Sequence, residues 1–365
     1  MNMDTSKVIL IVAIIIWIIL YSIRDSINLK TYGGIFGILR TKLGLKTIEK
    51  LGKYKIWQKI GIISIPICVI LGFFMLLNII DMSIRLLSGT LPKEAAKPVV
   101  FLFGDVIPWI PGIIALLIAI SVHELAHGIF AKSFGIKVKS SGILLLLGLP
   151  LGAFVELGDE FKTADKKIRG AIASAGPLAN LIIFLTSIPL LSFSYTLPTE
   201  LKIIDVKEPA SEFLQKGDII YEINGKKINS LEDFKEFAKT IEPKKEYEIK
   251  ILRDNKILTY KIVSSNEGKL GIMVSPTKNT ALFINTIYWT YWFNFLLALF
   301  NLLPAMPLDG FHVWNAFPEL LKERKNRFIS KVGQILELFI NEKTLGSITL
   351  LVWWVILGSI LYSMW

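Results

Sequence analysis

Three residues with the spacing of metal ligands lie inside one apolar run. His123, Glu124 and His127 form an H-E-x-x-H pattern within the sequence GIIALLIAISVHELAHGIF. Residues four apart share one face of a helix, so both imidazoles can reach a single metal ion. Glu124 can then act as general base toward a water molecule at that ion. The pattern predicts metal-assisted hydrolysis.

The surroundings of the motif also favour a functional role. Ionisable side chains within a membrane-spanning segment are costly unless they are satisfied, so they mark functional sites by default. The alternative is a polar contact between helices, but such a contact needs one polar residue rather than three at ligand spacing. We therefore interpret the motif as half of a metal centre.

The third protein ligand must come from elsewhere, because a catalytic zinc site takes three and keeps one position open. The chain has one further histidine, His312, and Asp309 lies three residues before it in the segment NLLPAMPLDGFH. Imidazole is the commoner ligand, but carboxylates also bind zinc. Residue chemistry thus leaves both Asp309 and His312 open, and Zn²⁺ is inferred from the ligand types.

The composition indicates that these residues lie in a membrane protein. Of the 365 residues, 53% are hydrophobic and 19% are charged, which is unlike a soluble chain of this length. Crossing a bilayer takes about 20 apolar residues. The candidate spans cover residues 8–23, 60–80, 112–133, 171–194, 281–303 and 346–364. No small-x-small cleavage site follows the first run, so we expect an uncleaved span rather than a signal peptide.

The net charge of +11 reflects topology rather than nucleic-acid binding. Lysines and arginines crowd the loop 24–59, as the positive-inside rule expects of a cytoplasmic loop, and no nucleic-acid motif is present. Alternating spans then put 134–170 and 304–345 on the cytoplasmic side and 196–279 outside. We expect a multi-pass protein of the cell membrane. The single cysteine, Cys68, can form no intrachain disulfide.

Two apolar segments do not resemble simple spans. Residues 142–158 are interrupted by glycines and a proline, which predicts a β-hairpin or re-entrant segment packed against protein. Such a hairpin could offer strand edges to an extended substrate. Residues 98–111 are bounded by prolines and contain Trp109, as an interfacial segment would.

Residues 199–277 have the pattern of a small water-soluble α+β domain. Alternating runs predict strands at 201–206, 219–223, 247–252 and 257–263, and helical spacing predicts a helix at 231–241. Asn224-Gly225 is a tight-turn signal. The stretch EPASEFLQKGDIIYEINGKKINSLEDF resembles the core of PDZ domains, where Gly-Asp-x-Ile precedes an Asn-Gly turn. A generic β domain is the alternative.

The combination of motifs resembles the site-2 protease family of intramembrane zinc metalloproteases. Besides the H-E-x-x-H span, it includes PLGAFVEL at 150–157, SAGPLAN at 174–180, and a later span ending in N-x-x-P-x-x-P-L-D-G at 301–310. The match covers residues 98–315. The resemblance implies cleavage of membrane protein substrates in or near their transmembrane segments, in regulated intramembrane proteolysis, toward the cytoplasmic side of the bilayer.

The resemblance also implies roles for individual residues. His123, His127 and Asp309 would hold Zn²⁺, Glu124 would be the base, and Asn180 and Asn301 would engage substrate. An interhelical hydrogen bond is the alternative for both asparagines.

The resemblance also implies a division into five regions. They are 1–97 (first spans and basic loop), 98–195 (core with the HExxH and GPxxN spans), 196–279 (PDZ-like domain), 280–315 (LDG span) and 316–365 (cytoplasmic segment and last span). A peptide is a further expected ligand of the PDZ-like domain.

Two functions of other classes are weaker alternatives. An intramembrane metal transporter would need several polar residues in the spans 60–80 and 346–364, which contain almost none. A catalytically inactive membrane scaffold would need a broken motif, yet the general base and all the presumed ligands are present.

Overall fold

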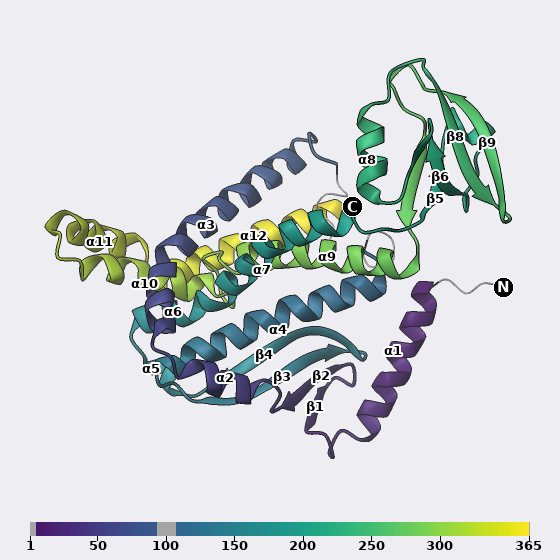
Figure 1. Cartoon of the computed structure of the whole chain (residues 1–365). Coiled ribbons are helices and arrows are strands. Elements are labelled where there is room, and N and C mark those ends of the chain that lie inside the picture. Colours follow the sequence, from purple (N-terminus) through teal and green to yellow (C-terminus); the bar gives the residue numbers. More distant parts are fainter. Residues whose placement is uncertain (1–4, 93–106, 365) are drawn as a thin grey trace. The chain divides into compact units, whose positions relative to one another are not determined.

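The computed structural model describes residues 5–92 and 107–364 and divides into two compact units (Figure 1). One unit comprises residues 1–185 and 289–365, and the other comprises residues 186–288. The chain leaves the first unit and later returns to it, as an inserted domain requires. Most of the predicted interfacial segment 98–111 lies outside the described residues, and helix α4 begins near its end.

Five helices among the described residues are long and apolar enough to cross a membrane. Four of them are α3 (Ile56–Leu87), α4 (Trp109–Ser133), α9 (Lys278–Phe300) and α12 (Glu342–Met364). The fifth is formed by two consecutive helices, α6 (Lys166–Ala173) and α7 (Ala175–Tyr195), which together make one span. They coincide with five of the six predicted spans. The remaining one falls in α1 (Thr5–Ser22), whose described apolar part, Ile11–Ser22, is shorter. A helical multi-pass membrane protein is supported, whereas the count of six stays a prediction.

Helix α4 carries the H-E-x-x-H motif in its C-terminal half. Its small residues Ala115, Ala119 and Ala126 are buried, which allows neighbouring helices to approach closely. The helix ends just before Gly135, whose φ of +82° is favourable for a residue without a side chain. The motif therefore lies in the packed part of the helix.

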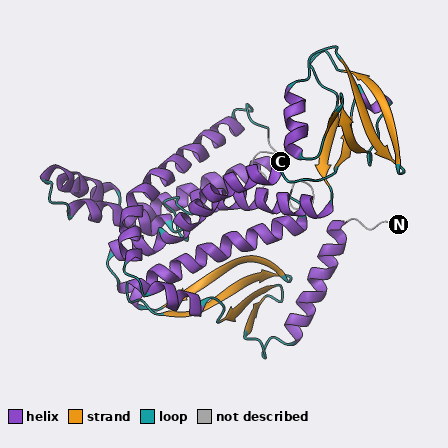
Figure 2. Ribbon diagram, in the orientation of Figure 1, coloured by secondary structure: helices purple, strands orange, loops and turns teal. Residues whose placement is uncertain are grey.

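A four-stranded antiparallel sheet adjoins α4, with the order β1 (Leu29–Tyr32), β2 (Phe36–Thr41), β3 (Val138–Leu146) and β4 (Leu149–Leu157). The β3–β4 hairpin is the one predicted at 142–158, although it begins earlier. Strands β1 and β2, with α2 (Leu45–Gly52), lie in the segment 24–59, which we expected only as a loop. Figure 2 shows that strands occur in this sheet and in the inserted unit. Strand β4 forms one edge of the sheet.

The inserted unit contains a second antiparallel sheet, in the order β10–β5–β6–β8–β9 with β7 paired to β6. Its elements are β5 (Leu201–Val206), the 3₁₀ turn Ala210–Glu212, β6 (Ile219–Ile223), β7 (Lys226–Lys227), α8 (Leu231–Lys239), β8 (Glu246–Arg253), β9 (Lys256–Val263) and β10 (Ile272–Pro276). The four predicted strands and the helix are confirmed within two residues at each end. Strands β7 and β10 were not predicted.

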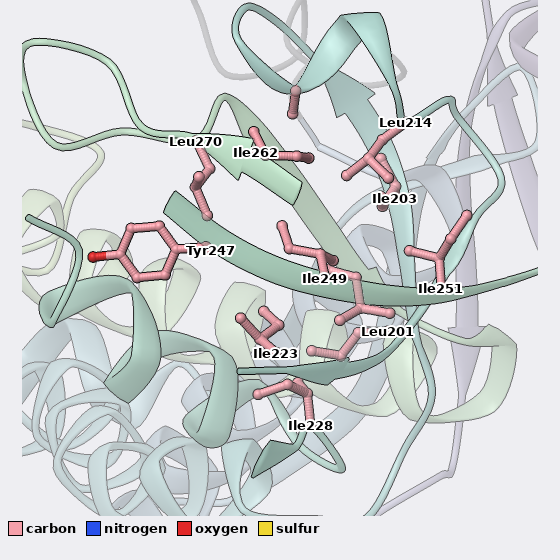
Figure 3. Close-up of a cluster of buried hydrophobic side chains, with 12 residues drawn as sticks. Leu201, Ile203, Leu214, Ile223, Ile228, Tyr247, Ile249, Ile251, Ile262 and Leu270 are labelled. Atoms are coloured by element: carbon pink, nitrogen blue, oxygen red, sulfur yellow. The ribbon is translucent and has the colours of Figure 1, made fainter. Parts of the chain in front are cut away.

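The core of this unit consists of side chains that alternate along the strands. Leu201, Ile203, Ile249 and Ile251 are fully buried, and further isoleucines surround them (Figure 3). Such alternation buries one face of each strand. Helix α8 packs its phenylalanines against the same cluster. The unit therefore has a hydrophobic core of its own.

Three shorter helices complete the first unit: α5 (Glu160–Thr163), α10 (Gly310–Lys322) and α11 (Arg327–Phe339). Helix α10 begins directly after the loop that ends α9 and packs against α3 and α6. Buried Val313 and Ala316 of α10 join Ile65 of α3 and Ala171 of α6 in one cluster. This packing fixes the start of α10, and with it Asp309.

Candidate metal centre

The two histidines of the motif point to the same side of α4. Their ring centroids are 4.7 Å apart, and the rings meet edge to face. His123 is 7% exposed, so the pair is largely removed from solvent. The helical spacing thus produces the convergence that the sequence predicts.

Asp309 lies opposite this pair, at the start of α10. Its Oδ2 atom is 3.0 Å from Nε2 of His123 and 3.3 Å from Nε2 of His127. The neighbouring residue must be glycine because a Cβ at Gly310 would lie 2.1 Å from the carbonyl oxygen of Leu303. Glycine is thus required beside the carboxylate by close backbone approach and not by a positive φ.

The donor atoms of His123, His127 and Asp309 all lie within 4.8 Å of one another. Two imidazole nitrogens and one carboxylate oxygen are ligands that zinc accepts, and three protein ligands leave a position open. The residues present fit a catalytic zinc site. His312 is not part of this group, because its ring packs edge to face against Phe161 and Phe311.

Hydrogen bonds to the far nitrogens fix how the imidazoles face the site. Nδ1 of His127 lies 2.8 Å from the carbonyl oxygen of Ile172, and Nδ1 of His123 lies 2.5 Å from Oδ1 of Asn180. A carbonyl oxygen can only accept, so Nδ1 of His127 carries the proton and its Nε2 has a lone pair for a metal. Partners of this kind orient metal-binding histidines and increase their basicity.

Gly176, at the start of α7, forms one wall of the site. A Cβ atom there would lie 2.5 Å from Nε2 of His127 and 2.6 Å from Nε2 of His123. The backbone of α7 thus packs directly against both rings. This glycine belongs to the SAGPLAN motif at 174–180, but its close contact with histidines of a different helix could not be read from the sequence.

Glu124 faces the sheet beside α4. Its Oε2 accepts a hydrogen bond of 2.9 Å from the backbone N–H of Val155 in the edge strand β4. That N–H is therefore on the open edge of the sheet, away from β3, and points toward the motif. The hairpin predicted from composition is in direct contact with the candidate base, a relationship the sequence did not reveal.

The two asparagines occupy different environments. Asn180 is fully buried, and its Nδ2 donates to the carbonyl oxygen of Ala119 and to Oδ1 of Asn294. Asn301 is partly buried, and its Nδ2 donates to the carbonyl oxygen of Leu297 in its own helix. Asn180 thus makes the interhelical hydrogen bonds that were the alternative role for both asparagines. Asn294 was missed because it is an isolated polar residue in an apolar span.

His312 lies behind the site, in α10. Burial lowers the pKa of this imidazole, and the nearby Arg169 guanidinium lowers it further. A neutral ring is consistent with its place between two phenylalanines. Its Nδ1 is buried and has no hydrogen-bond partner among the described residues.

Comparison with known proteins supports the chemistry of these residues. Residues 111–340 match the family described as Peptidase family M50. Proteins carrying the name "Putative zinc metalloprotease" are similar in sequence: one from Clostridium acetobutylicum (34% identity over 148 residues, 33% of this chain and 43% of the relative), one from Clostridium perfringens (31% over 159, 40% and 47%) and one from Borreliella burgdorferi (29% over 189, 41% and 43%). The chain thus spans less than half the length of each relative.

Proposed function

The chain belongs to peptidase family M50, since the match covers more than half of it, and we propose on that premise that it is an intramembrane zinc metalloprotease. It would hydrolyse peptide bonds in or near the transmembrane segments of substrate proteins. The observation that carries the proposal is the His123, His127 and Asp309 group, with Glu124 adjacent on the same helix. Zinc content, measured beside cleavage of a model transmembrane substrate, tests it.

The chain's own residues would divide the work of hydrolysis. His123, His127 and Asp309 hold the metal, and bound zinc supplies Lewis-acid chemistry for attack on an amide. Glu124 takes a proton from the attacking water and passes it to the leaving amine. The hydrogen bond from Val155 holds one oxygen of Glu124, so the carboxylate keeps a fixed orientation.

Strand β4 is the element best suited to receive an extended substrate. It is an edge strand, and edge strands present unpaired backbone groups that can pair with another chain. A substrate paired there would lie next to Glu124, which already contacts Val155 of this strand. Asn301 remains a proposed substrate contact, whereas Asn180 would first have to break its three hydrogen bonds.

The inserted unit would act as a PDZ-like domain that binds a peptide. A pocket of about 310 Å³ lies between α8 and the loop that leads into β10. Phe234, Phe237 and Ile241 line one side, and Leu270 and Ile272 line the other. Strand β10 is an edge of its sheet, so a peptide could extend the sheet while apolar side chains enter the pocket.

The lysine bias suggests that the zinc site lies toward the cytoplasmic side and the PDZ-like unit outside the cytoplasm. Pairing of β2 with β3 supports part of this topology, because it joins segments 36–41 and 141–146 in one sheet. Both segments must then lie on the same side, as the lysine bias requires of them. A transporter is less favoured, since the metal ligands are grouped with a general base in the family's arrangement.

A further inference from the structure

We propose that Asn294 is a positioning residue for the metal centre, acting on His123 through Asn180. The inference rests on the proposed zinc site and concerns a residue that lies in an otherwise apolar span. Asn294, in α9, and Asn180, in α7, are both fully buried. Burying an amide side chain in this way costs free energy unless its hydrogen bonds are made.

Two backbone carbonyl oxygens determine which atom donates and which accepts in each of these hydrogen bonds. Nδ2 of Asn294 lies 2.7 Å from the carbonyl oxygen of Thr290, which can only accept. Oδ1 of Asn294 must therefore face Asn180, whose Nδ2 donates to it at 2.7 Å. The same Nδ2 also donates to the carbonyl oxygen of Ala119 at 2.9 Å. Both donors of Asn180 are thereby used.

The orientation of Asn180 determines which nitrogen of His123 carries the proton. With Nδ2 committed, Oδ1 of Asn180 is the atom that faces Nδ1 of His123 at 2.5 Å, so Nδ1 of His123 must carry the proton. Nε2, the atom that faces Asp309, is then the nitrogen whose lone pair is offered when a metal is bound. Asn294 thus helps to select the metal-binding tautomer of His123. Its hydrogen bond with Asn180 also ties α9, whose end leads to Asp309, to α7.

The test compares three variants of the full-length protein in detergent. Asn294→Leu removes the acceptor for Asn180. Asn294→Asp keeps an acceptor, and in its neutral form it also keeps a donor to Thr290. Asn285→Leu is the matched control because Asn285 likewise donates to the carbonyl four residues earlier in α9, at 2.9 Å from Ala281, and Asn180 is not its partner. Zinc affinity by chelator competition and the Tm of the zinc-free protein are measured for each.

We expect Asn294→Leu to weaken zinc binding about tenfold, as loss of an outer partner of a ligand does. Asn294→Asp and Asn285→Leu should bind zinc like the wild type, and the zinc-free Tm shows separately how much general stability each variant loses. Wild-type affinity in Asn294→Leu, or an equal loss in Asn294→Asp, would overturn the inference. If Asn294→Leu does not fold, Asn294→Ala takes its place. A wild-type protein that binds no zinc would instead refute the proposed function.

Discussion

Gly176 packs so closely against His127 that a Cβ atom would lie 2.5 Å from the ring's Nε2. Substitution to alanine must therefore displace the imidazoles or the start of α7. We expect Gly176→Ala to lower zinc affinity by at least about tenfold, because ligand geometry is lost. The measurement is chelator competition on the purified protein.

Gly358→Ala is the control for this change, since a Cβ at Gly358, in the span α12, meets no atom within 4 Å. It should bind zinc normally. Equal zinc affinity in Gly176→Ala and Gly358→Ala would contradict the close packing around the histidines.

The identity of the third ligand gives a second prediction. Asp309→Ala should lose most zinc affinity and all activity, because Oδ2 of Asp309 faces both imidazole nitrogens. His312→Ala should keep the metal and lose at most part of the rate, because its ring packs between phenylalanines. Zinc titration of both variants decides the matter, and the reverse ranking would indicate a three-histidine site.

A third prediction concerns topology. Cysteines introduced at Lys46, in α2, and at Lys227, in β7, should react with an impermeant thiol reagent from opposite faces of the membrane. Both positions are exposed. Cys68→Ser serves as background, and Cys68 itself is buried. Labelling of both cysteines from the same face would refute the predicted arrangement of spans.

Sequence patterns were sufficient where the chemistry or packing is local. His123 and His127 lie on one helix, so their spacing alone determined their convergence. In the inserted unit, alternation along 201–206 and 247–252 predicted β5 and β8, because one face of each strand is buried. The choice of Asp309 needed the family resemblance, since residue chemistry alone slightly favoured His312, imidazole being the commoner zinc ligand.

Contacts between distant segments could not be predicted in this way. Strand β2 lies in a segment dominated by lysines, and only its pairing with β3, about 100 residues later, reveals it as part of a sheet. Gly176 and Asn294 acquire their importance from neighbours on other helices. No local pattern in a single sequence encodes such contacts.

Glu124 is proposed to be the base of a zinc peptidase, and Glu124→Gln separates proton transfer from metal binding. Glutamine keeps the shape and can still accept from Val155, but it cannot take a proton. We expect cleavage of a model transmembrane substrate to fall by at least about a hundredfold while bound zinc stays near one per chain. Proteolysis at the wild-type rate in this variant would contradict the mechanism.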